Sequence, residues 1–101
     1  MNREARGPAD GDVWVRLSAG GELIEHRGPG SEELADAVAY AVQMLDLVGQ
    51  LLGLAIPASI ELGFERGACF IERDGNGTLL AVKPGRGGTL EAARARLGAG
   101  A

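Results

Sequence analysis

The sequence predicts an α+β domain in which a five-stranded antiparallel sheet carries one long helix on one face. Short segments of alternating apolar and polar residues stand before and after a single long segment with helical spacing. The predicted order of elements is β-β-α-β-β-β-α. The chain has 101 residues, of which 46% are hydrophobic, and this size and composition are typical of one globular domain.

The first two strands are predicted to form a hairpin. Apolar residues occupy every second position from Val13 to Leu17, which is the period of a strand. The Ala-Gly-Gly segment at 19–21 suits a tight turn because glycine accepts positive φ. Residues 22–27 then return as the second strand.

A long helix is predicted from about Ser31 to Leu52, ending near Gly53. We expect Ser31 to be the N-cap, since its hydroxyl can accept a hydrogen bond from a first-turn amide. Glycine directly after a helical segment commonly ends the helix, and Gly53 stands at that position.

This helix has more apolar surface than one sheet can cover. The stripe expected to face the sheet contains Leu34, Val38, Ala41, Leu45, Val48 and Leu52. A second stripe, about 120° away, contains Tyr40, Met44, Leu47, Leu51 and Leu54. Because packing on one sheet requires a single apolar stripe, the second stripe predicts that another subunit covers it.

Three further strands are predicted at 59–65, 68–73 and 78–83. In the first of them the apolar residues share one face: Ile60, Leu62 and Phe64. The Asp-Gly-Asn-Gly segment that begins at Asp74 is typical of a hairpin turn. A short last helix is predicted after Thr89, which is a suitable N-cap.

We predict a flexible tail at 1–11, a single domain at 12–97 and a frayed C-terminus at 98–101. The sheet face opposite the long helix is partly apolar and is expected to be covered only by the short last helix. Trp14 and Phe70 lie on that face and form a possible partner surface. Ordinary packing of a half-buried strand tryptophan is the alternative, which we favour for Trp14.

Several functional classes are disfavoured by residue counts. The net charge of −4 disfavours nucleic acid as a partner, and no apolar stretch approaches the length of a membrane span. Cys69 is the single cysteine and His26 the single histidine, too few for a disulfide or a His/Cys metal site. We therefore expect a cytoplasmic protein without catalytic residues, metal or cofactor.

The ordered set of elements resembles the roadblock/dynein-light-chain domain family over about residues 12–97. The resemblance rests on the hairpin VRLSAGGELI, the long helix rich in Ala, Leu and Val, and the strand segments SIELGFERG, FIE and GTLLAV. Typical members begin with an amphipathic helix before the first strand. Residues 1–11 contain Gly7 and Pro8 and no apolar stripe, so the chain resembles a short variant without that helix.

The resemblance implies a fold related to profilin and longin domains. It also implies a homodimer in which third strands pair and long helices pack together, and bacterial members regulate or accompany small Ras-like GTPases. By this resemblance the dimer interface would contain Tyr40, Met44, Leu47, Leu51, Ile60, Leu62 and Phe64. We expect a non-enzymatic, dimeric module that binds or regulates such a GTPase. The alternative is a small-molecule sensor that uses the sheet face around Trp14 and Phe70.

Overall fold

The computed structural model describes residues 11–55, 57–64, 67–85, 88–92 and 94–95. Its elements are β1 (Val13–Leu17), β2 (Leu23–Arg27), α1 (Ser31–Leu52), β3 (Ser59–Phe64), β4 (Gly67–Arg73) and β5 (Leu79–Lys83). The predicted order of these six elements is confirmed. Residues 90–92 and 94–95 are helical, where the short last helix was predicted. Apart from Gly11, the predicted tail at 1–11 and the predicted frayed end at 98–101 lie outside the described residues.

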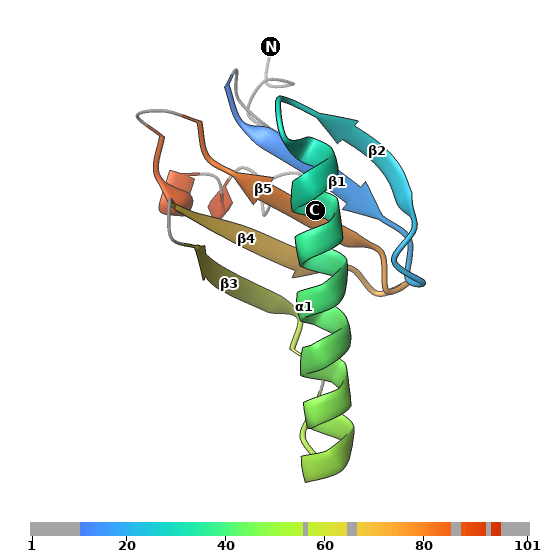
Figure 1. Cartoon of the computed structure of the whole chain (residues 1–101). Coiled ribbons are helices and arrows are strands. Elements are labelled where there is room, and N and C mark those ends of the chain that lie inside the picture. The colour runs from blue at the N-terminus through green and yellow to red at the C-terminus, as the bar shows by residue number, and fades with distance from the viewer. Residues whose placement is uncertain (1–10, 56, 65–66, 86–87, 93, 96–101) are drawn as a thin grey trace.

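The five strands form one antiparallel sheet in the order β2-β1-β5-β4-β3, with α1 lying across one face (Figure 1). The predicted fold class, an α+β domain with an antiparallel sheet, is therefore confirmed. β2 and β3 are the two edge strands. The residues that end β3 and begin β4 pair directly, since Phe64 stands opposite Gly67.

Side-chain oxygens stabilise the β1–β2 and β4–β5 turns. Ser18 Oγ accepts a hydrogen bond from the Glu22 amide at 3.1 Å in the β1–β2 turn. Asp74 Oδ1 accepts hydrogen bonds from the amides of Asn76 at 2.8 Å and Thr78 at 3.0 Å in the β4–β5 turn. The polar residues of these turns thus satisfy amides that the strand ladders leave without partners.

The two ends of α1 differ in how well they were predicted. Gly30 is the N-cap, with φ of 79° and no side-chain capping bond, and Ser31 is the first helical residue, so the N-cap assigned to Ser31 was wrong. The Ser31 hydroxyl instead lies 2.8 Å from His26 Nδ1 in β2. The predicted end at Gly53 is confirmed: its φ is 70°, and the Leu54 amide donates to the Gly49 carbonyl at 2.8 Å.

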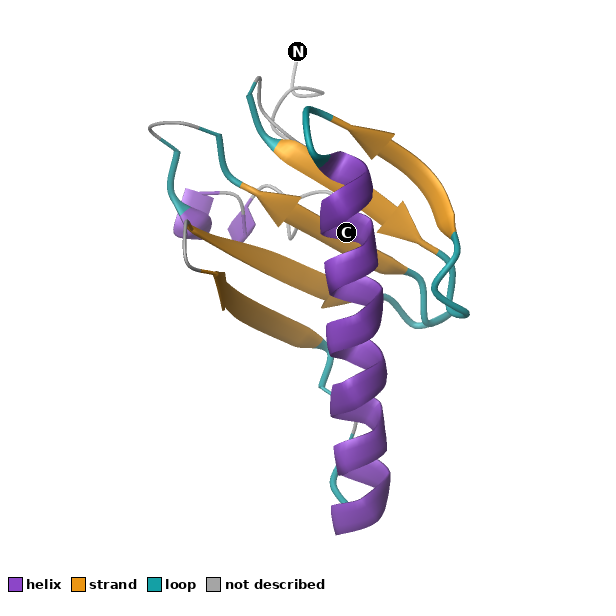
Figure 2. Cartoon of the chain, in the orientation of Figure 1, coloured by secondary structure: helices purple, strands orange, loops and turns teal. Residues whose placement is uncertain are grey.

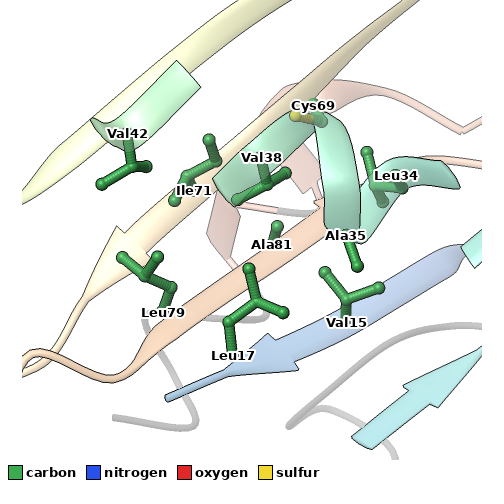
Figure 3. Packing of buried hydrophobic residues seen from close by; sticks show 10 residues of the cluster. All are labelled: Val15, Leu17, Leu34, Ala35, Val38, Val42, Cys69, Ile71, Leu79 and Ala81. Atoms are coloured by element: carbon green, nitrogen blue, oxygen red, sulfur yellow. The ribbon is translucent and has the colours of Figure 1, made fainter. Parts of the chain in front are cut away.

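The core lies between α1 and the sheet (Figure 3). It contains Val15, Leu17, Leu34, Ala35, Val38, Val42, Cys69, Ile71, Leu79 and Ala81. The α1 residues of this core end at Val42, and the C-terminal part of the helix continues beyond the sheet (Figure 2). The predicted sheet-facing stripe is therefore right at Leu34 and Val38 and wrong from Leu45 onward, where Leu45, Val48 and Leu52 are exposed.

Gly28, which follows β2, occupies a position that only glycine fits. Its φ is 99°, and a Cβ atom there would lie 2.8 Å from the Asp12 carbonyl oxygen. We expect Gly28→Ala to lower the free energy of unfolding by about 2–3 kcal/mol, measured by chemical denaturation. Gly30→Ala is the matched control: φ is 79° but the space is open, so a loss of about 1 kcal/mol is expected. Equal losses would show that the contact with Asp12 is unimportant.

Candidate interaction surfaces

Large apolar side chains are exposed along α1 and just beyond it. They are Tyr40, Met44, Leu45, Leu47, Val48, Leu51, Leu52 and Leu54, with exposed fractions from 38% to 75%. All but Tyr40 lie in the C-terminal half of α1 or in the segment that follows, and the C-terminal end of α1 extends past the sheet (Figure 1). Because monomeric proteins rarely expose a large contiguous apolar patch, this part of α1 is a candidate interaction surface.

The exposed residues of α1 separate into two stripes on different sides of the helix. At 100° per residue, Leu45, Val48 and Leu52 lie about 70° from the mean direction of the buried residues, and we call them the side stripe. Tyr40, Met44, Leu47 and Leu51 lie about 170° from that direction, facing away from the sheet, and we call them the outward stripe. The two stripes therefore face different directions.

The side stripe lies on the flank of α1 that faces β3. Ala39 and Gln43, on the opposite flank, lie next to Gly21 in the turn that leads to β2. Ala37 is on the same flank as the side stripe and lines a shallow hollow with Lys83 of β5. Since the strand order runs from β2 through β5 to β3, this flank points toward β3.

β3 presents an open edge beside that flank. Among the described strands it pairs with β4 alone, so every second amide and carbonyl along its outer edge points away from the sheet. Ile60 and Leu62 are half-buried and pack against the core on the α1 side. Ile60 and Leu62 thus lie on the sheet face that carries α1.

The sheet face opposite α1 is better covered than the sequence led us to expect. Trp14 and Phe70 are only 8% and 3% exposed and form a second cluster with Val82, against which Leu80 and Leu90 pack. The Arg94 guanidinium lies 5.5 Å from the centre of the Phe70 ring. The expected thinly covered partner surface at Trp14 and Phe70 is thus corrected, because Leu90 and Arg94 of the last helical segment pack onto it.

Comparisons with known proteins were made by sequence and by structure. No family model matches the sequence, and neither does any curated protein. The structure is similar to Myxococcus xanthus MglB, with a TM-score of 0.72 at 17% identity, covering 98% of this chain and 80% of that one. A Roadblock/LC7 domain from Streptomyces avermitilis matches with a TM-score of 0.63 at 22% identity, covering 86% and 76%. The chain has the roadblock fold. The gliding protein mglB from Thermus thermophilus is also similar, with a TM-score of 0.62 at 19% identity over 84% of this chain and 74% of that one.

One ion pair fixes the middle of α1 to the sheet of this roadblock fold. The Arg73 guanidinium at the end of β4 donates two hydrogen bonds to the Asp46 carboxylate, at 3.0 and 3.3 Å, and both side chains are mostly buried. Beyond this point α1 leaves the sheet. The pair therefore ties α1 to β4 just before the helix leaves the sheet.

We expect Asp46→Asn to lower the free energy of unfolding by about 1–2 kcal/mol, because the charge-assisted pair with Arg73 is lost in a partly buried place. Asp36→Asn, at an exposed position of the same helix, is expected to change it by less than about 0.5 kcal/mol. Chemical denaturation measures both. A loss at Asp46 no larger than that at Asp36 would contradict a stabilising role for the pair.

Cys69 in β4 is fully buried among apolar side chains of the roadblock core. Burial raises the pKa of its thiol from 9.0 to about 11, although the positive charge of Lys83 acts in the opposite direction. The unfolded chain therefore loses this proton at lower pH than the folded chain. The stability that the protonated thiol contributes is complete below pH 9 and is lost as pH rises toward 11.

We expect the wild-type protein to lose about 2–3 kcal/mol more of its free energy of unfolding between pH 9 and 11 than a Cys69→Ala variant does. The comparison cancels any pH dependence that the two proteins share. Urea denaturation across this pH range makes the measurement. Parallel pH profiles for the two proteins would contradict the raised thiol pKa.

Neither a metal site nor a membrane-spanning helix is found in the part of the chain that the structure describes. No three side chains of the His, Cys, Asp or Glu type come together there in a way that could hold an ion. None of its helices is both long and apolar enough to cross a bilayer.

Proposed function

We propose that the chain is a non-enzymatic module that forms a homodimer and, as a dimer, binds or regulates a Ras-like small GTPase. The observation that carries the proposal is the open edge of β3 beside the exposed side stripe of α1. The likeness to MglB and Roadblock/LC7 structures supports it at the level of the fold. The role with a GTPase rests on the family resemblance of the sequence.

The proposed dimer follows from the positions of β3 and α1. Antiparallel pairing of β3 with its copy joins the two sheets edge to edge and satisfies the outward backbone groups of both strands. The two α1 helices then lie on the same face of the joined sheet, with their β3-side flanks toward each other. Leu45, Val48 and Leu52 of each copy become buried, and each fully buried side chain contributes about 1.5–3 kcal/mol.

This arrangement redistributes the residues that the sequence assigned to the interface. Ile60, Leu62 and Phe64 remain in it through the backbone of β3. The α1 residues in the proposed interface are those of the side stripe instead of the outward stripe, since the outward stripe faces away from the sheet and from the partner helix. The side chains that the sequence singled out, Tyr40, Met44, Leu47 and Leu51, are then exposed in the dimer.

The test uses the purified full-length chain and purified Ras-like GTPases from the same organism, loaded with GTP or GDP. We expect the chain to sediment as a dimer at tens of micromolar, to bind a GTP-loaded GTPase and to change its single-turnover hydrolysis rate. A monomeric chain would overturn the dimer. A stable dimer that binds none of the GTPases in either nucleotide state would overturn the regulatory role alone.

The alternative function, a small-molecule sensor on the face around Trp14 and Phe70, loses its structural motive because both side chains are buried. A cytoplasmic location forms part of the main proposal. It is supported by a single cysteine, Cys69, which is buried and unpaired in the structure and suits a reducing compartment.

A further inference from the structure

We propose that the outward stripe of α1 docks an amphipathic helix of a partner protein, antiparallel to α1, whose last turn carries Lys or Arg. The proposal goes beyond a role with a GTPase and does not depend on that role. It concerns Tyr40, Met44, Leu47 and Leu51, which face away from the sheet and which the proposed dimer leaves exposed.

The outward stripe has the geometry of a helix-docking surface. Its residues are spaced by four, three and four positions and fall within an arc of about 60°, so they form a straight apolar row. Their exposed fractions lie between 41% and 75%. Partner helices commonly use the same spacing to insert side chains into such a surface. Tyr40 and Met44 are residue types that are enriched in protein interfaces.

The charge on α1 selects the chemistry of the partner. Residues 31–52 contain no Lys or Arg and carry Glu32, Glu33, Asp36 and Asp46. Asp46 is paired with Arg73, and the other three are exposed in the first turns. Glu33 lies in line with the outward stripe at its N-terminal end, and Asp36 lies beside it. The row is thus acidic at one end and apolar over the rest.

This polarity also gives the direction of the partner helix. Basic side chains must lie over Glu33 and Asp36, at the N-terminal end of α1. Lys and Arg are most favourable in the last turn of a helix, where they interact with its dipole. A partner whose last turn lies there runs antiparallel to α1, and its dipole then opposes that of α1 favourably. From Glu33 to Leu51 the surface is about 27 Å long, which matches a helix of about 18 residues.

Two other occupants fit these charges less well. A second copy of α1 in parallel orientation would bring the acidic turns together, and in antiparallel orientation it would place Glu33 over Leu51 without a basic partner. A membrane surface attracts amphipathic helices through Lys and Arg on the polar face, and α1 has neither. A basic amphipathic helix satisfies both the apolar row and the acidic end.

The experiment titrates the full chain with a labelled synthetic helix of about 18 residues that has leucines on one face and lysines in its last turn. Fluorescence anisotropy measures the Kd. We expect binding that weakens with salt, and a loss of at least about tenfold when the lysines are replaced by glutamates. We expect Leu51→Gln to weaken binding at least about tenfold, and Glu33→Gln or Asp36→Asn to weaken it by about two- to fivefold each.

Gln50→Ala is the matched control, since Gln50 is exposed in the same turn as Leu51 but lies about 90° from the centre of the outward stripe, and it should leave the Kd unchanged. Thermal unfolding checks that each variant is folded. Val48→Glu, in the side stripe, separates this proposal from the proposed dimer: peptide binding by that variant is expected whether or not the chain dimerises.

Any one of four results would overturn the proposal. Equal binding of the lysine and glutamate peptides, or binding that ignores Leu51→Gln, would show non-specific adhesion. A tetramer that Leu51→Gln dissociates, with no peptide bound, would assign the stripe to a second copy. Sedimentation with vesicles of phosphatidylcholine and phosphatidylserine, abolished by Leu51→Gln, would assign the stripe to a membrane.

Discussion

Val48→Glu is expected to convert the dimer into monomers, whereas Leu47→Glu at the neighbouring position is expected to leave the dimer intact. The two residues are about 100° apart on α1, so Val48 faces the proposed partner helix and Leu47 faces away from the sheet. Two glutamates without partners would be buried in each Val48→Glu dimer. We expect its dissociation constant to rise at least about a hundredfold, measured by sedimentation velocity across a concentration series.

Both side chains have the same exposed fraction of 47% in the protomer, so neither change should disturb folding, and circular dichroism checks this. The two substitutions therefore match each other closely: both replace an aliphatic side chain by glutamate, at neighbouring positions of α1. If Leu47→Glu dissociates the dimer and Val48→Glu does not, the interface lies on the outward stripe. The assignment made from the sequence would then be right and the one made from the structure wrong.

The elements of this fold could be predicted from the sequence because each leaves a local signal. Apolar residues alternate along Val13–Leu17, and β1 has those bounds. The run from Ser31 to Leu52 has helical spacing and ends before Gly53, and α1 has those bounds. These signals depend on neighbours a few residues away, so they survive without knowledge of the tertiary structure.

The use of each surface depends on contacts that no local pattern reports. The sequence could show that α1 has excess apolar residues. It could not show that the helix extends past the sheet, where Val48 and Leu52 are exposed. In the same way, the burial of Trp14 and Phe70 depends on Leu90, which packs onto their cluster from a distant part of the chain. The Ser31 hydroxyl hydrogen-bonds to His26 Nδ1 of β2 and does not cap α1. This contact also depends on the tertiary arrangement of the two elements.

We expect dimerisation to have a large effect on the hydrogen exchange of the backbone amides along the open edge of β3. In an isolated protomer every second amide of Ser59–Phe64 faces solvent, and in the proposed dimer these amides bond to the copy of β3. We expect them to exchange at least about a hundredfold more slowly in the wild-type dimer than in the Val48→Glu monomer. Amide-resolved exchange followed by nuclear magnetic resonance makes the comparison.

β2 provides the internal control, because it is the other edge strand and all five of its residues are exposed. The proposed dimer gives Leu23–Arg27 no new neighbour, so its outward amides should exchange quickly in both proteins. Slow exchange at β2 with fast exchange at β3 would mean that the copies pair through the wrong edge. Fast exchange at both edges in a stable dimer would mean that the helices alone hold the copies together, and the sheets would then be separate.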